Sequence, residues 1–362
     1  MAVTEQQVLD ALRVVRDPDL HKDIVALNFV KAVKIDGAAV AVTIELTTPA
    51  CPVKDLLRDQ AQAAIEALPG VSRADVTMTA QVRTANRPEQ GPRTAIPGVK
   101  NVIAVGAGKG GVGKTTLSVN LAIALAQRGS RVALLDADVY GPNVPIMLGL
   151  KTQLEADGQK IRPAEKYGLQ VVSVGFMTQD DAPIIWRGPM LHGAVNQFFR
   201  DVKWNDVDYL IVDMPPGTGD VALSLSQSVP VAGAVVVTTP QTVSLSDTTR
   251  AIKMYQKLNI PVIGLVENMS HFACPSCHHE SDIFGKGGGE ELAANMAVPF
   301  LGRIPLYQPI RSGGDTGRPI VLVEPDSPAA AAIFGAAEKV AQQVSIASYG
   351  KKLIPLTQVS AG

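Results

Sequence analysis

The sequence predicts an α/β fold with a mainly parallel, doubly wound sheet, preceded by a small α+β domain. Hydrophobic residues make up 46% of the 362 residues but aromatic residues only 4%, and a stock of Ala, Val, Ile and Leu is the usual filling of layered α/β domains. Six short apolar segments alternate with stretches long enough for helices, which is typical of a parallel sheet. The length exceeds that of one ordinary globular unit, so we expect two domains.

The charge balance and the N-terminal residues argue against several classes of protein. Lys and Arg number 33 against 34 Asp and Glu, and a net charge of -1 offers no bulk attraction to nucleic acid or an anionic membrane. The N-terminus carries acidic residues early and has no uninterrupted apolar core, unlike a signal peptide. No apolar run approaches the roughly 18 residues of a membrane-spanning helix. We therefore expect a soluble, cytoplasmic protein.

Residues 1–82 predict a small α-β-β-α-β domain. Val8, Leu12 and Val15 recur at helical spacing. Two β-rich segments are joined by Asp36-Gly37, a pair that tolerates the positive φ angles of a tight hairpin turn. The expected elements are a helix over 4–16, strands over 29–35 and 38–46, a helix from Pro52 to Leu68, and a strand over 71–79.

A linker and a larger domain follow. Residues 83–99 hold three prolines and two glycines without an apolar period, so we place a linker there. The larger domain is expected over 100–350, with a C-terminal tail over 351–362. Its expected strands are 101–106, 131–136, 170–174, 208–213, 232–238 and 260–266, and its last helix is 329–345. Ligands of such sheets bind beyond the C-terminal ends of the strands.

A phosphate-binding loop joins the first of these strands to a helix. Residues 108–115 read G-x-x-x-x-G-K-T in the strand-to-helix context that the motif requires, which predicts a P-loop NTPase. Glycines let successive backbone N–H groups point at phosphate oxygens of ATP. Lys114 is expected to bridge the β- and γ-phosphates, and the Thr115 hydroxyl to ligate Mg²⁺. The loop residues expected to bind ATP are Gly108, Lys109, Gly110, Gly111, Val112, Gly113, Lys114, Thr115 and Thr116.

Five further polar residues are candidates for the same site. Lys109 is a second lysine inside the glycine run and can reach phosphate or developing charge, unless it is a solvated loop lysine. Asp136, Asp138 and Asp213 stand where strands should end, where a carboxylate can hold Mg²⁺ or orient the attacking water. The alternative for each is a capping or turn aspartate. Asn268 is expected to read a base edge, or to cap its own backbone.

The three cysteines are too few for a disulfide framework, and two of them form a C-x-x-C pair. Cys274 and Cys277 can converge on one metal or cluster. A [4Fe-4S] cluster takes four thiolates, so two chains related by a two-fold axis would complete it. A zinc site is the competing possibility, and redox or structural thiols are the third. The histidines that would complete a zinc site are His271, His278 and His279.

Cys51 precedes Pro52 at an expected helix start. A helix N-terminus lowers the pKa of a thiol and favours the thiolate. Cys51 is therefore a candidate transfer thiol, and the alternative is a small buried hydrophobic residue.

A family resemblance covers nearly the whole chain. The phosphate loop with Lys109, the pair Asp136 and Asp138, and the segment 213–219 resemble the deviant Walker A ATPases that include MinD and ParA. Four more segments resemble the Mrp/ApbC branch of iron-sulfur cluster carriers, namely 135–143, 267–270, 274–277 and 283–289. Asp17-Pro18 and residues 47–52 are similar to the small iron-sulfur assembly domain often fused to these ATPases. His278 departs from the pattern, because glycine is expected after the second cysteine.

The resemblance implies ATP hydrolysis by a homodimer that carries an iron-sulfur cluster between its subunits. Lys109 would act across the interface and Asp138 would position water. Asp136 and Asp213 map to the magnesium side, and Asn268 to the adenine side. The implied partners are cluster-assembly scaffold proteins and the apo iron-sulfur proteins that receive the cluster.

Two other functions compete with this hypothesis. A MinD- or ParA-like spatial organiser would assemble on membrane or DNA, but the expected helix over 329–345 is alanine-rich with one lysine, and Lys351-Lys352 is a small basic cluster. The chain has no Lys/Arg stripe for DNA. We therefore expect neither nucleic-acid binding nor stable membrane association. A zinc-stabilised metal chaperone is the other alternative.

Overall fold

The structure is a computed structural model that describes residues 3–85, 94–139, 141–151, 154–158, 160–176, 193, 197–217, 220–274, 277 and 279–349. The chain divides into two compact units. Unit 1 comprises Met1–Asn86 together with Ser345–Gly362, and unit 2 comprises Arg87–Val344. The expected tail over 351–362 lies outside the described residues, as do residues 86–93 of the expected linker.

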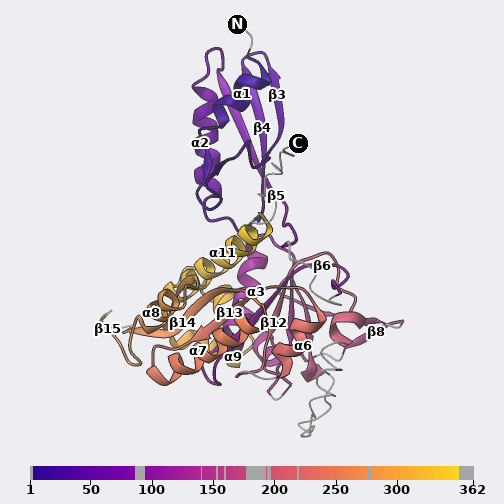
Figure 1. The fold of residues 1–362 in the computed structure, drawn as a ribbon, viewed down its shortest axis with the longest axis vertical. Helices are drawn as coiled ribbons and strands as arrows, with labels where there is room; N and C mark the ends of the chain where they lie inside the picture. The colour runs from indigo at the N-terminus through magenta and orange to yellow at the C-terminus, as the bar shows by residue number, and fades with distance from the viewer. Residues whose placement is uncertain are drawn as a thin grey trace, which may run out of the picture. The chain divides into compact units, whose positions relative to one another are not determined.

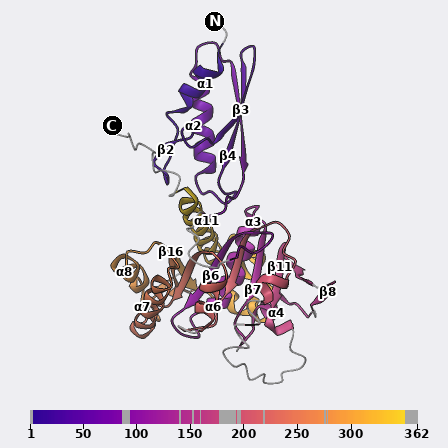
Figure 2. The same ribbon diagram turned by 45° about the vertical axis from the view of Figure 1, so that its right-hand side comes forward.

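Unit 1 contains the expected α-β-β-α-β elements. Its hairpin turns at Gly37, whose φ is 58°, and its third strand pairs in parallel with the second, so the helix between them is a crossover. The buried residues of the second strand alternate along one face, on which both helices lie (Figures 1 and 2). The elements are α1 (Glu5–Leu12), β3 (Val30–Asp36), β4 (Ala39–Leu46), α2 (Lys54–Glu66) and β5 (Arg73–Ala80).

The first helix is shorter than expected. It ends at Leu12 rather than residue 16, because β1 (Arg16–Asp17) turns back and pairs with β2 (Lys22–Asp23). Its start has a capping box, in which the side chains of Thr4 and Gln7 each accept from the other's backbone N–H. Local chemistry thus determined where the helix begins, and strand pairing determined where it ends.

The last turn of the C-terminal helix α11 (Pro328–Tyr349) belongs to unit 1. Tyr349 is buried there and packs edge-on against Phe29, with 6.1 Å between ring centroids. Arg83 lies over the Tyr349 ring at 5.0 Å, and the hydroxyls of Thr47 and Ser345 are hydrogen-bonded. The second domain was expected to extend to residue 350, whereas the compact unit ends at Val344, because these contacts place the final turn in the core of unit 1.

Unit 2 is built on a twisted sheet whose neighbouring strands follow the order β10-β11-β7-β12-β6-β13-β14-β15, with β16 also paired to β14. The β10–β11 and β14–β15 pairs are antiparallel, and the remaining pairs in this sheet are parallel. The strands are β6 (Val99–Ala107), β7 (Val132–Asp136), β10 (Ala164–Lys166), β11 (Leu169–Ser173), β12 (Val207–Asp213), β13 (Val231–Thr238), β14 (Val262–Ala273), β15 (Glu280–Ser281) and β16 (Phe300–Leu306). A separate hairpin joins β8 (Glu155–Asp157) to β9 (Lys160–Arg162).

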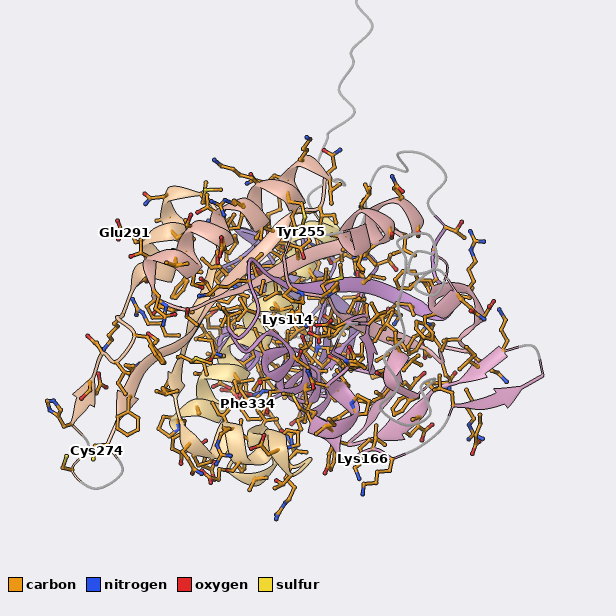
Figure 3. The ribbon with its side chains drawn as sticks, turned by 90° about the horizontal axis from the view of Figure 1, so that it is seen from below. Lys114, Lys166, Tyr255, Cys274, Glu291 and Phe334 are labelled. Atoms are coloured by element: carbon orange, nitrogen blue, oxygen red, sulfur yellow. The ribbon has the colours of Figure 1, made fainter. Side chains whose placement is uncertain are left out.

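Helices cover both faces of this sheet. Figure 3 places Tyr255 and Glu291 on one side of the sheet and Phe334 of α11 on the other, with Lys114 between them. The described helices of unit 2, besides α11, are α3 (Lys114–Gln127), α4 (Val144–Leu148), α6 (Asp220–Ser228), α7 (Thr242–Lys257), α8 (Gly288–Asn295), α9 (Gln308–Asp315) and α10 (Ile320–Val323). The expected mainly parallel, doubly wound α/β fold is thereby confirmed. Within the described residues, no helix is both long and apolar enough to span a membrane.

All six expected strands of unit 2 are present, but β14 is longer than expected, and five further strands were not predicted, namely β8, β9, β10, β15 and β16. β14 was expected to end at residue 266 but continues to Ala273, because its far end pairs with β15 and with Leu306 of β16. β16 itself was not predicted. Its sequence contains Gly302 and Pro305 and shows neither strand alternation nor a continuous apolar run, which is why no pattern predicted it. The strand is also only partly buried.

A buried carboxylate links three parallel strands at their N-terminal ends. Asp208 of β12 accepts hydrogen bonds at Oδ1 from Lys100 Nζ of β6 at 2.8 Å and from Arg131 Nη2 at 2.9 Å. Its Oδ2 accepts from the backbone N–H of Arg131, next to β7, at 2.9 Å. Burial raises the pKa of the Asp208 carboxyl, but the hydrogen bonds from Arg131 and Lys100 outweigh burial and lower its pKa below the ordinary value.

We predict that Asp208→Asn lowers the free energy of unfolding of unit 2 by about 2 kcal/mol at pH 7, because charge-assisted hydrogen bonds are lost. Since the folded-state pKa is depressed, the stabilisation is complete above the unfolded pKa of about 3.9 and is lost as pH falls through the folded pKa. The gap between variant and unmodified protein should therefore close below about pH 4. Urea unfolding followed by tryptophan fluorescence measures this, because both tryptophans belong to unit 2.

Asp206→Asn is the matched control. Asp206 contacts the same Arg131 but is exposed, and exposed ion pairs contribute at most about 1 kcal/mol. Equal destabilisation by the two substitutions would contradict the role given to Asp208.

Candidate functional site

The phosphate-binding loop lies between β6 and α3, at the C-terminal edge of the parallel sheet. Gly111 and Gly113 have φ angles of 79° and 85°, in the left-handed region that favours glycine. A Cβ on Gly108 would lie 2.3 Å from the carbonyl carbon of Asp247, so α7 passes directly against the loop. The loop therefore has the backbone conformation and the helix start that a bound phosphate requires.

Lys114, Thr115 and Asp213 meet beside this loop. Lys114 Nζ lies 2.7 Å from Asp213 Oδ2, and the Thr115 hydroxyl donates to the same oxygen at 2.8 Å. Ser118 Oγ donates to Asp213 Oδ1 at 2.6 Å. Lys114 is only 7% exposed and Asp213 is fully buried. Hydroxyl and carboxylate oxygens together form a donor set that suits Mg²⁺.

Asp136 and Asp138 lie at the end of the neighbouring strand β7. Asp136 is buried and accepts from Ser173 Oγ at 3.0 Å and from the backbone N–H groups of Asp138 and Val144 at 3.2 Å each. Burial, together with repulsion from Asp213, raises the pKa of Asp136 to about 8. Asp138 Oδ2 is 3.6 Å from Lys114 Nζ. The three predicted aspartates thus surround one lysine, and a divalent cation there would favour ionisation of Asp136.

Asn268 also contacts the loop, in a way that the sequence did not predict. Its side chain is buried, and Nδ2 donates to the carbonyl of Val112 at 2.9 Å. The close approach explains Gly113, because a Cβ there would lie 2.2 Å from Nδ2. Asn268 was expected just after the end of the strand, whereas it lies within β14. Its contact with an adenine base remains a prediction.

Lys109 differs from Lys114 in its surroundings. It is half-buried, and no carboxylate of the described residues lies within ion-pair distance of it. Gly110, its neighbour, is exposed, and a Cβ there would meet no atom within 4 Å. This part of the loop therefore borders solvent in the single chain. Thr116 is half-buried on the first turn of α3.

The cysteine pair lies on a hairpin formed by β14 and β15. The backbone N–H of Cys274 donates to the carbonyl of His279 at 3.0 Å. Cys274 is half-buried and Cys277 is exposed. Figure 3 shows Cys274 at the margin of unit 2, away from the central Lys114. The C-x-x-C pair and the phosphate loop therefore occupy separate parts of the same unit.

The surroundings of the cysteine pair bear on the choice between cluster and zinc. The residues described by the structure contain no group of three or more His, Cys, Asp or Glu side chains placed to hold a metal ion. His271 and His279, two of the histidines considered for zinc, thus form no such group with the thiols. His278 lies outside the described residues. A four-thiolate cluster would need two such pairs of thiols.

Cys51 belongs to unit 1 and is half-buried against its hydrophobic core. Pro52 was expected to open a helix, but α2 begins at Lys54 with Val53 as its cap. Cys51 therefore precedes the helix by a short turn, in which its carbonyl accepts from the Lys54 N–H at 3.3 Å. A transfer role for Cys51 remains a prediction.

Sequence reasoning missed three polar residues of these sites. Ser118 and Ser173 hold the carboxylates of Asp213 and Asp136, and Glu267 is a fully buried carboxylate on β14. Ser118 was detectable, because it lies one helical turn after Lys114 and faces the same side. Glu267 gave two signals, an acidic residue at the end of an apolar strand and its place in the segment 267–270 that carries the family resemblance. Ser173 gave none, since its partner comes from a neighbouring strand.

Two family models match the chain. The model described as NUBPL iron-transfer P-loop NTPase, of the ParA family, matches residues 98–341. The model of the iron-sulfur cluster assembly protein family matches residues 5–77. The two matches fall on the larger and the smaller unit, respectively.

Individual relatives agree with these matches. An iron-sulfur cluster carrier protein of Synechocystis sp. is 48% identical and the alignment covers 96% of this chain and 99% of the relative. Among solved structures, the nucleotide-binding protein in complex with ADP from Archaeoglobus fulgidus is 34% identical with a TM-score of 0.57, covering 65% of this chain and 91% of that one. The cell division ATPase MinD of Pyrococcus furiosus is 24% identical with a TM-score of 0.51, covering 66% and 98%, and it supports the fold alone.

The phosphate loop with its buried lysine and aspartates, the C-x-x-C hairpin and the extent of the family match lead to one conclusion. The chain belongs to the NUBPL iron-transfer P-loop NTPase family.

Proposed function

We propose that this protein is an ATP-dependent iron-sulfur cluster carrier that binds a [4Fe-4S] cluster between two subunits and transfers it to apo-proteins. The observation that carries the proposal is one unit with both a complete phosphate site around Lys114 and Asp213 and a hairpin that presents two cysteines. Relatives that match nearly the full chain are named iron-sulfur cluster carrier proteins, which supports the same function.

ATP hydrolysis is assigned to the buried cluster of charges. The loop amides and Lys114 bind the phosphates, and Thr115, Asp213 and the nearby Asp136 would hold Mg²⁺. Asp138, near Lys114, is placed to orient the attacking water. Asn268, already against the loop, is the candidate for the adenine side. Mg²⁺ bound there neutralises charge that develops on the phosphates.

The cluster is the cargo, and Cys274 and Cys277 are its ligands in each subunit. A [4Fe-4S] cluster needs four thiolates, so a homodimer with one pair from each subunit completes the set. Lys109, half-buried and without an acidic partner among the described residues, acts on the nucleotide of the partner subunit. The action of Lys109 on the partner's nucleotide and the need for four thiolates therefore both require a symmetric dimer.

Hydrolysis serves as a switch rather than as a source of fast turnover. ATP can favour cluster release or acceptance only through its different affinities for two arrangements of the dimer. The donors are cluster-assembly scaffold proteins and the recipients are apo iron-sulfur proteins. Location in the cytoplasm stays a prediction from the sequence.

We predict that Lys114→Ala lowers the rate of ATP hydrolysis by about 10²–10³-fold, because a charge that stabilises the transferring phosphate is lost. Cluster loading should be unchanged, since the cysteine hairpin is remote from Lys114 (Figure 3). A steady-state phosphate-release assay and iron analysis of the same samples measure both. Lys257→Ala, at an exposed lysine of α7, is the control. Unchanged hydrolysis in Lys114→Ala would mean that the loop is not the ATPase site.

We predict that Cys274→Ala and Cys277→Ala each abolish cluster binding, since a cluster cannot be held with half of its thiolates missing. Iron, sulfide and zinc per chain and the visible absorption spectrum are measured after anaerobic purification. Cys51→Ala, in the other unit, is the matched control and should retain iron and colour. A colourless protein with stoichiometric zinc would favour the zinc-stabilised metal chaperone instead.

We predict that Lys109→Ala and Lys114→Ala complement each other. Each variant alone is inactive, but in a mixed dimer the Lys109→Ala chain keeps its own Lys114 and receives Lys109 from its partner. Random mixing should restore about a quarter of the unmodified ATPase rate, because half of the dimers are mixed and each has one intact site. The assay is phosphate release after mixing at equal concentrations. If mixing restores nothing, Lys109 does not act across an interface.

A further inference from the structure

Glu267 is a fully buried carboxylate on β14 that the proposed ATPase chemistry does not use. Its Oε1 accepts from the Ser270 hydroxyl and, at 3.0 Å, from the N–H of Gly287, and its Oε2 accepts from the N–H of Gly289 at 2.6 Å. Arg303 of β16 is the cross-strand partner of Glu267. Its Nε lies 3.7 Å from Oε1, and its guanidinium provides the balancing positive charge. Both carboxylate oxygens therefore have partners, as a buried charge requires.

The partners of Glu267 lie on both sides of the cysteine pair in the sequence. Ser270 precedes Cys274, while Gly287 and Gly289 follow Cys277. One carboxylate thus closes the base of the segment 271–286 that carries both thiols. Figure 1 shows β14, β15 and α8 gathered at this margin of the sheet.

The backbone around the start of α8 is shaped for this contact. The residue before α8 offers no side-chain cap. The N–H groups of Gly287 and Gly289 instead donate to Glu267 of strand β14. A Cβ at Gly289 would lie 2.9 Å from the Cβ of Glu267, and Gly287 has a φ of 89°. The glycine run therefore allows the backbone to approach the carboxylate closely.

The next residue, Asn268, makes the corresponding contact on the nucleotide side. Successive strand residues point to opposite faces, and the Asn268 amide donates to Val112 of the phosphate loop at 2.9 Å. Directly after it, Met269 adopts a left-handed φ of 55°, and the pairing of β14 with β16 shifts register there. Two adjacent residues thus hold the phosphate loop and the base of the cysteine hairpin.

We propose that Glu267 is a positioning residue that couples the nucleotide loop to the cysteine hairpin, through its neighbour Asn268. ATP that orders the loop around its phosphates holds Val112 and Asn268 in place, and Glu267 in turn holds the two sides of the hairpin base together. Loss of the carboxylate opens the base and leaves the thiols insensitive to nucleotide. The inference rests on the proposed function, in which this loop binds ATP and these thiols hold the cargo.

The test compares Glu267→Gln with the unmodified full chain, both reduced and free of iron. Alkylation of Cys274 and Cys277 by iodoacetamide is followed by peptide mass spectrometry, with and without Mg-ATP. In the unmodified chain ATP should slow alkylation of the half-buried Cys274 by about fivefold, the low end of ordinary coupling between sites. In Glu267→Gln alkylation of Cys274 without ATP should be about tenfold faster, because an opening equilibrium shifts by that factor when a charge-assisted hydrogen bond is lost. ATP should then have no effect on it.

Two controls separate positioning from general damage to the fold. Glu291→Gln removes an exposed carboxylate from the first turn of the same helix α8 (Figure 3), and it should behave as the unmodified chain does. Cys51, in unit 1, serves as an internal reference thiol whose alkylation should not change. ATP hydrolysis by Glu267→Gln should match the unmodified rate, and the amides of Gly287 and Gly289 should exchange hydrogen faster.

Several results would overturn the inference. These are equal alkylation in Glu267→Gln and the unmodified chain, a retained response to ATP in the variant, or no response to ATP in the unmodified chain. If Glu267→Gln fails to fold, Ser270→Ala decides, because it removes one bond of the set, and unchanged alkylation there refutes the proposal. None of these measurements needs iron, so a failure of cluster binding would be seen separately, by metal analysis.

Discussion

The buried carboxylate of Asp213 is the constraint on which the nucleotide site depends. A carboxylate without exposure must be paired and hydrogen-bonded, because leaving it uncompensated costs several kcal/mol. Its two oxygens are held by Lys114, Thr115 and Ser118, all from the first turns of α3. The contacts fix α3 against β12 and aim the phosphate loop at the open edge of the sheet. Burial, together with repulsion from Asp213, then raises the pKa of Asp136 to about 8.

The requirement that a buried carboxylate be paired also shapes the base of the cysteine hairpin. Glu267 is as deeply buried as Asp213, and its partners come from the hairpin base and the start of α8. Because β14 carries Glu267 and Asn268 side by side, the strand contacts both the base of the cysteine hairpin and the phosphate loop.

Most of the secondary structure of the chain was predictable, and the exceptions share a cause. The hairpin around Gly37, the strands of the parallel sheet and the P-loop follow from sequence patterns that each lie within one element or one turn. The missed strand β16 and the end of β14 depend on pairing between distant segments. The final turn of α11 continues an alanine-rich helix, and only the core around Phe29 assigns it to unit 1.

The sequence by itself determined the α/β class, the phosphate loop with Lys109 and Lys114, the aspartates at the strand ends and the C-x-x-C pair. These signals are local, because the chemistry demands particular residues at fixed spacing. The tertiary structure alone decided that Asn268 contacts the loop and that Glu267 accepts a hydrogen bond from Gly287, beyond the cysteine pair. Each of these contacts joins residues far apart in the chain, and the free energy of burying a charge or amide depends on neighbours that only the folded sheet brings together.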